Sequence, residues 1–140
     1  MRTLFAVLFL ITILPGCGSG PEKVTYARPY PAIAQSEVLN VQVVRGTTTI
    51  ALTNTSARAF GPSTLWLNGR YSRPIDGLKV GQSMTLPMAE FRDEFQDAFR
   101  GGGFFASEPP ERLVLAQIET PGEDGKERLL GLLVVGGDPE

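Results

Sequence analysis

Histidine is absent from the 140 residues of this chain, and cysteine occurs only once, as Cys17. Histidine is the side chain that most often serves as a general base near neutral pH and as a metal ligand. A disulfide needs two cysteines, so none can form within one chain. We therefore expect no histidine-dependent catalysis, no bound metal and no cofactor. We also expect a fold that its core stabilises without a covalent cross-link.

Positive charge is not in excess. The net charge of the chain is −2, whereas a domain that binds nucleic acid through its phosphates usually carries a basic surface. Hydrophobic residues make up 42% of the chain, which is the proportion of a globular protein rather than a disordered one. The composition thus predicts a folded domain whose partner is not a nucleic acid.

Carboxylates arranged for catalysis are also missing. The densest group is Glu90, Asp93, Glu94 and Asp97, on a segment expected to be helical, where these side chains would face solvent. Glycoside hydrolysis needs two carboxylates across a cleft, and a calcium site needs roughly six or more oxygens, usually from a loop. The glycines at 101–103 lack the lysine and hydroxyl partner of a phosphate-binding loop. We expect the protein not to be an enzyme.

No hydrophobic run is long enough to cross a membrane as a helix. The run Leu4–Leu14 has 11 residues and is interrupted only by Thr12, whereas a transmembrane helix needs about 20. Arg2 supplies a positive charge before the run. This pattern is typical of a secretory signal peptide, so residues 1–16 are predicted to be removed.

The residues at the end of this run, Leu14, Pro15, Gly16 and Cys17, resemble the lipobox of bacterial lipoproteins, with Pro15 where alanine or serine is usual. The resemblance implies export, recognition of these residues for cleavage after Gly16, and lipid on the Cys17 sulfur. This lipid would attach the protein to a bacterial membrane, which is therefore one of its expected partners. Gly18 stands where an aspartate would signal retention in the inner membrane of many Gram-negative bacteria. For a Gram-negative source we therefore expect the periplasmic face of the outer membrane.

Residues 17–36 are expected to comprise the lipidated cysteine and a flexible stalk. A glycine-serine-glycine stretch at 18–20 is followed by scattered prolines, which favour extended backbone. Tyr26 and Tyr30 are isolated in this segment. We interpret them as packing on the edge of the domain that follows, with a motif for a partner as the alternative.

Strand patterns begin after the stalk. Apolar and polar residues alternate from Leu39 to Val43, and residues 47–54 continue as a second strand of a hairpin. Asn68-Gly69 is the strongest hairpin signal, because a type I′ turn requires positive φ at both positions. The segments 112–120 and 128–135 are nearly continuous in apolar character, which favours central strands covered on both faces.

These patterns place one domain at residues 37–137, with an all-β fold class. About seven strands with regularly spaced turn signals favour an antiparallel β-sandwich, similar to the immunoglobulin-like and fibronectin-like modules of bacterial surfaces. An α+β roll is the alternative, because one segment departs from the strand pattern.

That segment carries Phe91, Phe95 and Phe99, four residues apart and separated by charged side chains. The spacing predicts a short inserted helix over about residues 89–100 with the three rings on one stripe. The glycines at 101–103 would end this helix. We expect all three rings to pack into the core.

The candidate ligand-binding residues are Trp66, Tyr71, Arg58, Arg70 and Arg73. Aromatic rings beside arginines on an exposed sheet face can stack on sugar rings or bind an anionic partner. A buried tryptophan is the more common arrangement in a small sandwich domain, and we favour it here. The exposure of Trp66 and Tyr71 distinguishes the two interpretations.

The function that follows from the sequence is a membrane-anchored lipoprotein with a non-catalytic domain. This domain would be a structural or interaction module of the cell envelope, and its partner an envelope protein or the cell wall. The alternative is a module that binds cell-wall glycan or another envelope ligand through the aromatic and arginine side chains.

Overall fold

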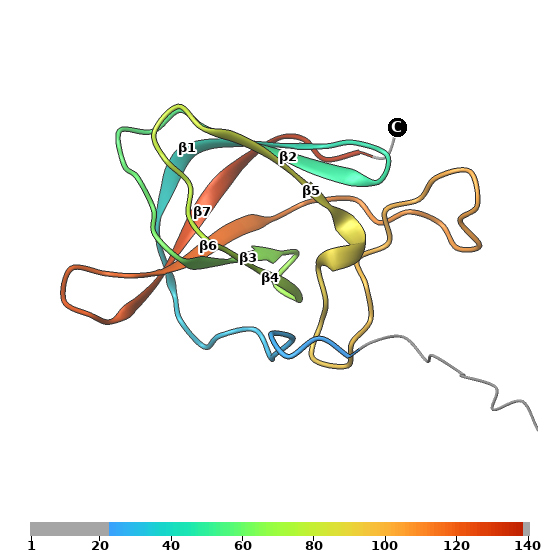
Figure 1. The fold of residues 1–140 in the computed structure, drawn as a ribbon, viewed down its shortest axis with the longest axis horizontal. Helices are drawn as coiled ribbons and strands as arrows, with labels where there is room; N and C mark the ends of the chain where they lie inside the picture. Colours follow the sequence, from blue (N-terminus) through green and yellow to red (C-terminus); the bar gives the residue numbers. More distant parts are fainter. Residues whose placement is uncertain (1–22, 139–140) are drawn as a thin grey trace, which may run out of the picture.

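Seven strands form one continuous sheet in the computed structural model, which describes residues 23–138 (Figure 1). The strands are β1 Gln35–Arg45, β2 Thr49–Asn54, β3 Ser63–Leu67, β4 Tyr71–Ile75, β5 Ser83–Pro87, β6 Ala116–Pro121 and β7 Glu127–Gly136. Their order in the sheet is β4-β3-β6-β7-β1-β2-β5. The predicted all-β fold class is confirmed. The predicted signal peptide, lipobox and Cys17 lie outside the described residues.

The two hairpins that local sequence signals predicted are present. Strands β1 and β2 pair antiparallel from Val41↔Asn54 to Arg45↔Ile50, and their alternating apolar side chains point into the core. Strands β3 and β4 are joined by Asn68 and Gly69, whose φ angles are 52° and 63°. Both residues therefore adopt the left-handed backbone that a type I′ turn requires.

The centre of the sheet is not antiparallel. Strands β6 and β7 form an antiparallel hairpin, but β7 then pairs in parallel with β1. The prediction of a wholly antiparallel sandwich is therefore wrong at this pair. Two strands distant in sequence meet here, so no local turn signal reports their relative direction.

The sheet curls into a half-barrel, with β1, β2 and β5 lying over β3 and β4 in Figure 1. The chain after β5 passes from one edge of the sheet to the other through a single 3-10 turn, η1 (Met88–Glu90). It reaches the β4 edge at Ser72, whose backbone exchanges two hydrogen bonds of 2.8 and 3.0 Å with Arg92. The crossing segment thus partly closes the open side of the curled sheet.

The predicted helix over residues 89–100 is not formed beyond the three residues of η1. Residues 92–98 instead make a small hairpin in which the Asp93 carboxylate accepts hydrogen bonds from the backbone N–H groups of Phe95 and Asp97. Gln96 has a φ of 75°, which a right-handed helix does not accommodate. The prediction fails because an aspartate that bonds to nearby backbone N–H groups competes with helix formation.

The three phenylalanines consequently separate. Phe91 and Phe99 are 0% and 2% exposed and belong to the core, while Phe95 at the tip of the hairpin is 74% exposed. The backbone N–H of Phe99 donates to the carbonyl of Phe91 over 3.0 Å, so the two residues lie opposite each other at the base of the hairpin. The prediction that all three rings are buried is wrong for Phe95.

The glycines at 101–103 do not end a helix. Gly102 and Gly103 have φ angles of 102° and 106°, a region that favours glycine. A Cβ on Gly101 would lie 3.3 Å from both the Met88 sulfur and the Thr47 carbonyl oxygen. The glycines therefore let this loop pass close to the β1–β2 turn. Among the described residues, no helix has the length and apolar character needed to cross a membrane.

The described part of the expected stalk packs against the sheet. The backbone of Val24 exchanges hydrogen bonds with the side chain of Gln96, and the Tyr26 hydroxyl donates to the Glu90 carbonyl over 2.5 Å. The Tyr30 hydroxyl donates to Gln117 over 2.7 Å. The interpretation that both tyrosines pack on the domain is confirmed. Strand β1 begins at Gln35, close to the predicted start of the domain at residue 37.

Candidate functional site

The two aromatic residues predicted to form a ligand-binding face are both buried. Trp66 is 0% exposed and Tyr71 is 3% exposed. Neither ring offers a flat face on which a sugar could stack. The favoured interpretation, a tryptophan buried in the domain, is therefore the observed one.

Trp66 is covered by the segment before β1. Its indole N–H donates to Glu119 over 2.7 Å, and the Tyr30 ring meets it edge-on at 5.3 Å between centroids. The Arg28 guanidinium lies 5.2 Å from the centre of the indole ring and forms an ion pair with Glu119 at 2.7 Å. This side of β3 is closed by residues 28–30, and the indole N–H, the Glu119 carboxylate and the Arg28 guanidinium are paired with one another.

Tyr71 takes part in a second buried cluster. Its hydroxyl donates to Glu111 over 2.9 Å, its ring meets Phe99 edge-on, and the Arg70 guanidinium lies 4.9 Å from the ring centre. Burial and the hydrogen bond to Glu111 raise the pKa of Tyr71 to about 12. The phenol therefore stays neutral at physiological pH and is not a general base.

Arg70 holds the one buried carboxylate of the acidic group. Its guanidinium donates to Asp93 through Nε at 2.9 Å and through Nη2 at 2.6 Å. Burial opposes ionisation of Asp93, but these bonds and those from the Asp97 and Phe95 N–H groups outweigh it and lower the pKa. Asp93 is therefore ionised at neutral pH and does not act as a proton donor. The prediction that these acids share a solvated helix face is wrong for Asp93, which is 1% exposed.

The remaining two predicted arginines are not part of one face. Arg73 forms an ion pair with Glu90 at 2.6 Å, and Arg58 forms one with Glu37 at 2.7 Å. Arg70 and Arg73 lie on or beside β4, whereas Arg58 follows β2 and lies near the β6–β7 turn. The structure thus brings Arg70 next to Tyr71 but does not gather the five predicted residues into one site.

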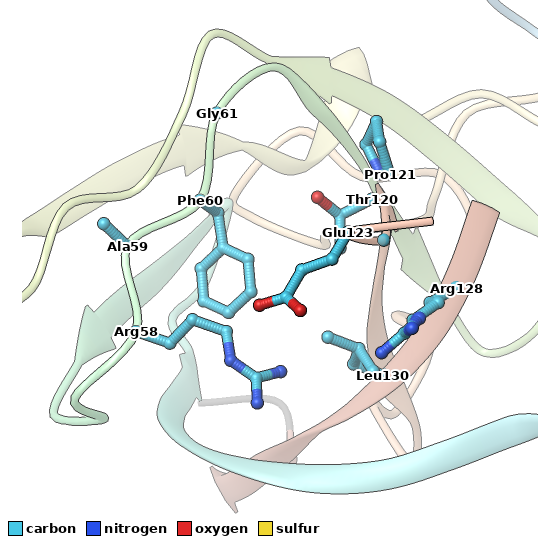
Figure 2. A pocket seen from close by; sticks show the side chains of 10 residues that line it. Arg58, Ala59, Phe60, Gly61, Thr120, Pro121, Glu123, Arg128 and Leu130 are labelled. Carbon is cyan, nitrogen blue, oxygen red and sulfur yellow. The ribbon is translucent and has the colours of Figure 1, made fainter. Parts of the chain in front are cut away.

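Arg58 lies instead in a hollow of about 360 Å³ between the β2–β3 connection and the β6–β7 hairpin (Figure 2). The hollow is lined by Arg58, Ala59, Phe60, Gly61, Thr120, Pro121, Gly122, Glu123, Arg128 and Leu130. Its volume is near the lower limit for sites that hold small ligands.

The hollow carries charges of both signs on an apolar base. Figure 2 shows the Glu123 carboxylate pointing into the space that Arg58 and Phe60 border. Arg128 is half exposed and lies 3.7 Å from Asp124, so it remains accessible to a ligand. Gly122 makes room for this side chain, because a Cβ there would overlap the Arg128 Nε. Of the lining residues, only Arg58 was predicted from the sequence to bind a ligand, since the hollow forms where the β2–β3 connection meets β6 and β7 in the fold.

The one hydroxyl of the hollow, from Thr120, shares a hydrogen bond of 3.0 Å with Ser63. The two guanidinium groups of the hollow can donate hydrogen bonds to an acidic group of a small polar ligand. Its carboxylate can accept hydrogen bonds from hydroxyl or amide groups of the same ligand. Within residues 23–138, no three acidic or other metal-ligating side chains are placed to hold a metal ion.

Comparisons of this chain with protein-family models, with curated proteins and with solved structures found no match.

Proposed function

We propose that this protein is a membrane-anchored bacterial lipoprotein whose β domain is a non-catalytic structural or interaction module of the cell envelope. The observation that carries the proposal is the position of its only cysteine. Cys17 follows the short hydrophobic run directly, in the sequence Leu14-Pro15-Gly16-Cys17. Removal of residues 1–16 would leave Cys17 as the new amino terminus, with lipid on its sulfur.

The arrangement of the described side chains supports a non-catalytic role. Asp93, Glu111 and Glu119, which approach the predicted aromatic residues, each accept hydrogen bonds that hold the fold together. A general acid or base needs instead to reach a substrate and to titrate near the working pH.

The proposal needs no immunoglobulin-like sandwich, because a curled sheet on a lipid anchor presents surface for contacts equally well. We place the protein on the periplasmic face of the outer membrane if its source is Gram-negative.

Replacement of the cysteine tests the anchor. We expect Cys17→Ser to leave a full-length precursor without lipid, because neither the lipid-accepting sulfur nor the residue required at the cleavage site remains. Intact-mass analysis of the protein from membranes would show the mass of residues 1–140 for the variant. The wild type would show residues 17–140 plus acyl chains. Ser19→Ala, two residues away, serves as the control and should be processed like the wild type. A processed, lipid-bearing Cys17→Ser protein would refute the proposal.

A second candidate function is favoured by the hollow that contains Arg58. Muramic acid in cell-wall glycan carries a free carboxylate where no peptide is attached to it, and the guanidinium groups of Arg58 and Arg128 provide partners of opposite charge. Phe60 and Leu130 supply apolar surface for a sugar ring. The hollow would therefore bind an acidic glycan fragment in a site different from the predicted aromatic face.

Binding of a defined fragment tests this second function. We expect the N-acetylglucosamine–N-acetylmuramic acid disaccharide to bind the purified protein and Arg128→Ala to weaken that binding by about tenfold or more, because one charge-assisted hydrogen bond is lost. Arg112→Ala is the matched control, since Arg112 is exposed and pairs with Asp138 outside the hollow. Isothermal titration calorimetry measures both. Equal affinity of the two variants, or no binding by the wild type, would refute the glycan site.

A further inference from the structure

Three phenylalanine rings are exposed on two loops of the domain. Phe95 is 74% exposed at the tip of the 92–98 hairpin, and Phe104 and Phe105 are 95% and 93% exposed in the loop that follows. The other phenylalanines of residues 23–138 are all buried. Phe104 and Phe105 also contact each other edge-on, at 5.0 Å between centroids. Large apolar side chains gathered on a surface mark a site of contact with a protein or a membrane.

The two loops are neighbours. Asp97 and Ala98 from the hairpin line the same small hollow as Arg100 and Glu108 from the following loop. Arg100 and Glu108 form an ion pair at 3.1 Å, which connects the second loop to the base of the first. In Figure 1 the 92–98 hairpin points to the bottom of the view and the following loop to its right, and both lie away from the β6–β7 turn at the left.

The described chain begins beside the same hairpin. Val24 exchanges two hydrogen bonds with Gln96, of 2.9 and 3.2 Å, and Lys23 lines a hollow together with Phe95. Only seven peptide units join Cys17 to Val24, so the anchor can lie at most about 25 Å from this point. A domain of this size has a radius of gyration of about 13 Å and hence a diameter greater than that reach.

The short connection limits which surface can face the lipid. Because the chain is attached to the domain at Val24, the side that carries Phe95 stays closest to the anchoring membrane. Glu94, Asp97 and Glu108 lie in the same two loops, so attraction to anionic headgroups does not explain a contact there. The exposed rings instead suit the boundary between headgroups and acyl chains, where apolar side chains of membrane-bound proteins are buried.

We propose that Phe95, Phe104 and Phe105 insert into the phospholipid surface and hold the domain against the membrane in one orientation. The proposal deepens the proposed function and rests on the lipid anchor at Cys17. The rings would act as a second attachment beside the acyl chains, and more than one such signal makes membrane binding durable. The 92–98 hairpin faces the lipid, and the hollow of Figure 2 stays open to solvent.

Single cysteines introduced into the processed protein test the contact. Phe95→Cys and Phe104→Cys carry the probe into the two loops, and Val80→Cys is the control, because Val80 is 55% exposed in the turn between β4 and β5. Each protein is labelled with an environment-sensitive nitrobenzoxadiazole maleimide and reconstituted in vesicles of phosphatidylethanolamine and phosphatidylglycerol. The thioether at a lipidated Cys17 does not react, so each variant carries one label.

The two loop labels are expected to shift their emission to shorter wavelength and to brighten about twofold or more on reconstitution, as probes do when they leave water for lipid. Spin-labelled phospholipid should quench both of them and leave the label at position 80 unchanged. Equal emission and equal quenching at all three positions, with the lipid present on Cys17, would overturn this proposal alone. Labelling of the wild type at Cys17 would show a free thiol and overturn the anchor as well.

Discussion

Phe91→Ala is expected to lower the free energy of unfolding by about 3 to 5 kcal/mol, the usual cost of truncating a buried phenylalanine. The ring is 0% exposed and lies among Val43, Leu65 and Leu132, side chains from three different strands. It enters the core where the chain crosses from β5 to β4, so its loss removes contacts with the inner strands of the curled sheet. Against a total stability of about 5 to 15 kcal/mol, such a loss can unfold a domain without disulfides.

Phe95→Ala is the matched control for this experiment. The two rings are four residues apart in one sequence pattern, but Phe95 is 74% exposed, so its removal should change the free energy of unfolding by about 0.5 kcal/mol or less. Urea denaturation followed by Trp66 fluorescence measures both variants. If the two substitutions cost the same, the hairpin does not direct Phe91 and Phe95 to opposite environments.

The phenylalanine pattern shows what periodicity could and could not predict. A spacing of four places three rings on one helix face, but it equally places the first and last at the base of a hairpin and the second at its tip. Whether the segment forms a helix or a hairpin depends on Asp93. Its carboxylate binds two backbone N–H groups and the Arg70 guanidinium. Arg70 belongs to another part of the sheet, so this competition could not be read from the segment alone.

Local signals predicted most of the strands and the β1–β2 and β3–β4 hairpins, because turn chemistry and alternation act over a few residues. The parallel pairing of β1 with β7 could not be predicted in this way, since it joins residues such as Leu39 and Leu132 that are far apart in the chain. That pairing makes the observed sheet a curled mixed sheet rather than an antiparallel sandwich.

The candidate site was only partly predictable for the same reason. Alternation in β3 assigns Leu65 and Leu67 to one face and Trp66 to the other, which left open whether the indole is covered. The cover comes from Arg28 and Tyr30, in a proline-rich segment expected to be a stalk. Tyr30 was the available signal, because an isolated tyrosine beside a domain has an apolar ring to bury and a hydroxyl to pair.

Substitution of Arg45 is the second change for which we expect a large loss of stability. It is 1% exposed at the end of β1 although it is an arginine. Its guanidinium donates to the Glu111 carbonyl over 2.9 Å, to the Gly46 carbonyl over 2.8 Å, and also to the carbonyl of Gly101. These bonds fasten both ends of the loop that carries Phe104 to the β1–β2 hairpin. The arginine thus satisfies backbone groups that the glycine-rich loop leaves without strand partners.

Arg45→Met should therefore lower the free energy of unfolding by about 3 kcal/mol, because buried carbonyl groups that lose their donor cost about 1 to 3 kcal/mol each. Methionine keeps most of the side-chain length, so the loss reports the hydrogen bonds more than a cavity. Amide hydrogen exchange should also accelerate between residues 101 and 111 while the β1–β2 hairpin stays protected.

Arg112→Met is the control: its side chain is 68% exposed and its ion pair with Asp138 lies on the surface, so its cost should be about 1 kcal/mol or less. If the two arginines prove equally costly, or if exchange in the loop is unchanged, Arg45 does not hold the loop in place. The orientation of Phe104 and Phe105 would then depend on the Arg100–Glu108 ion pair instead.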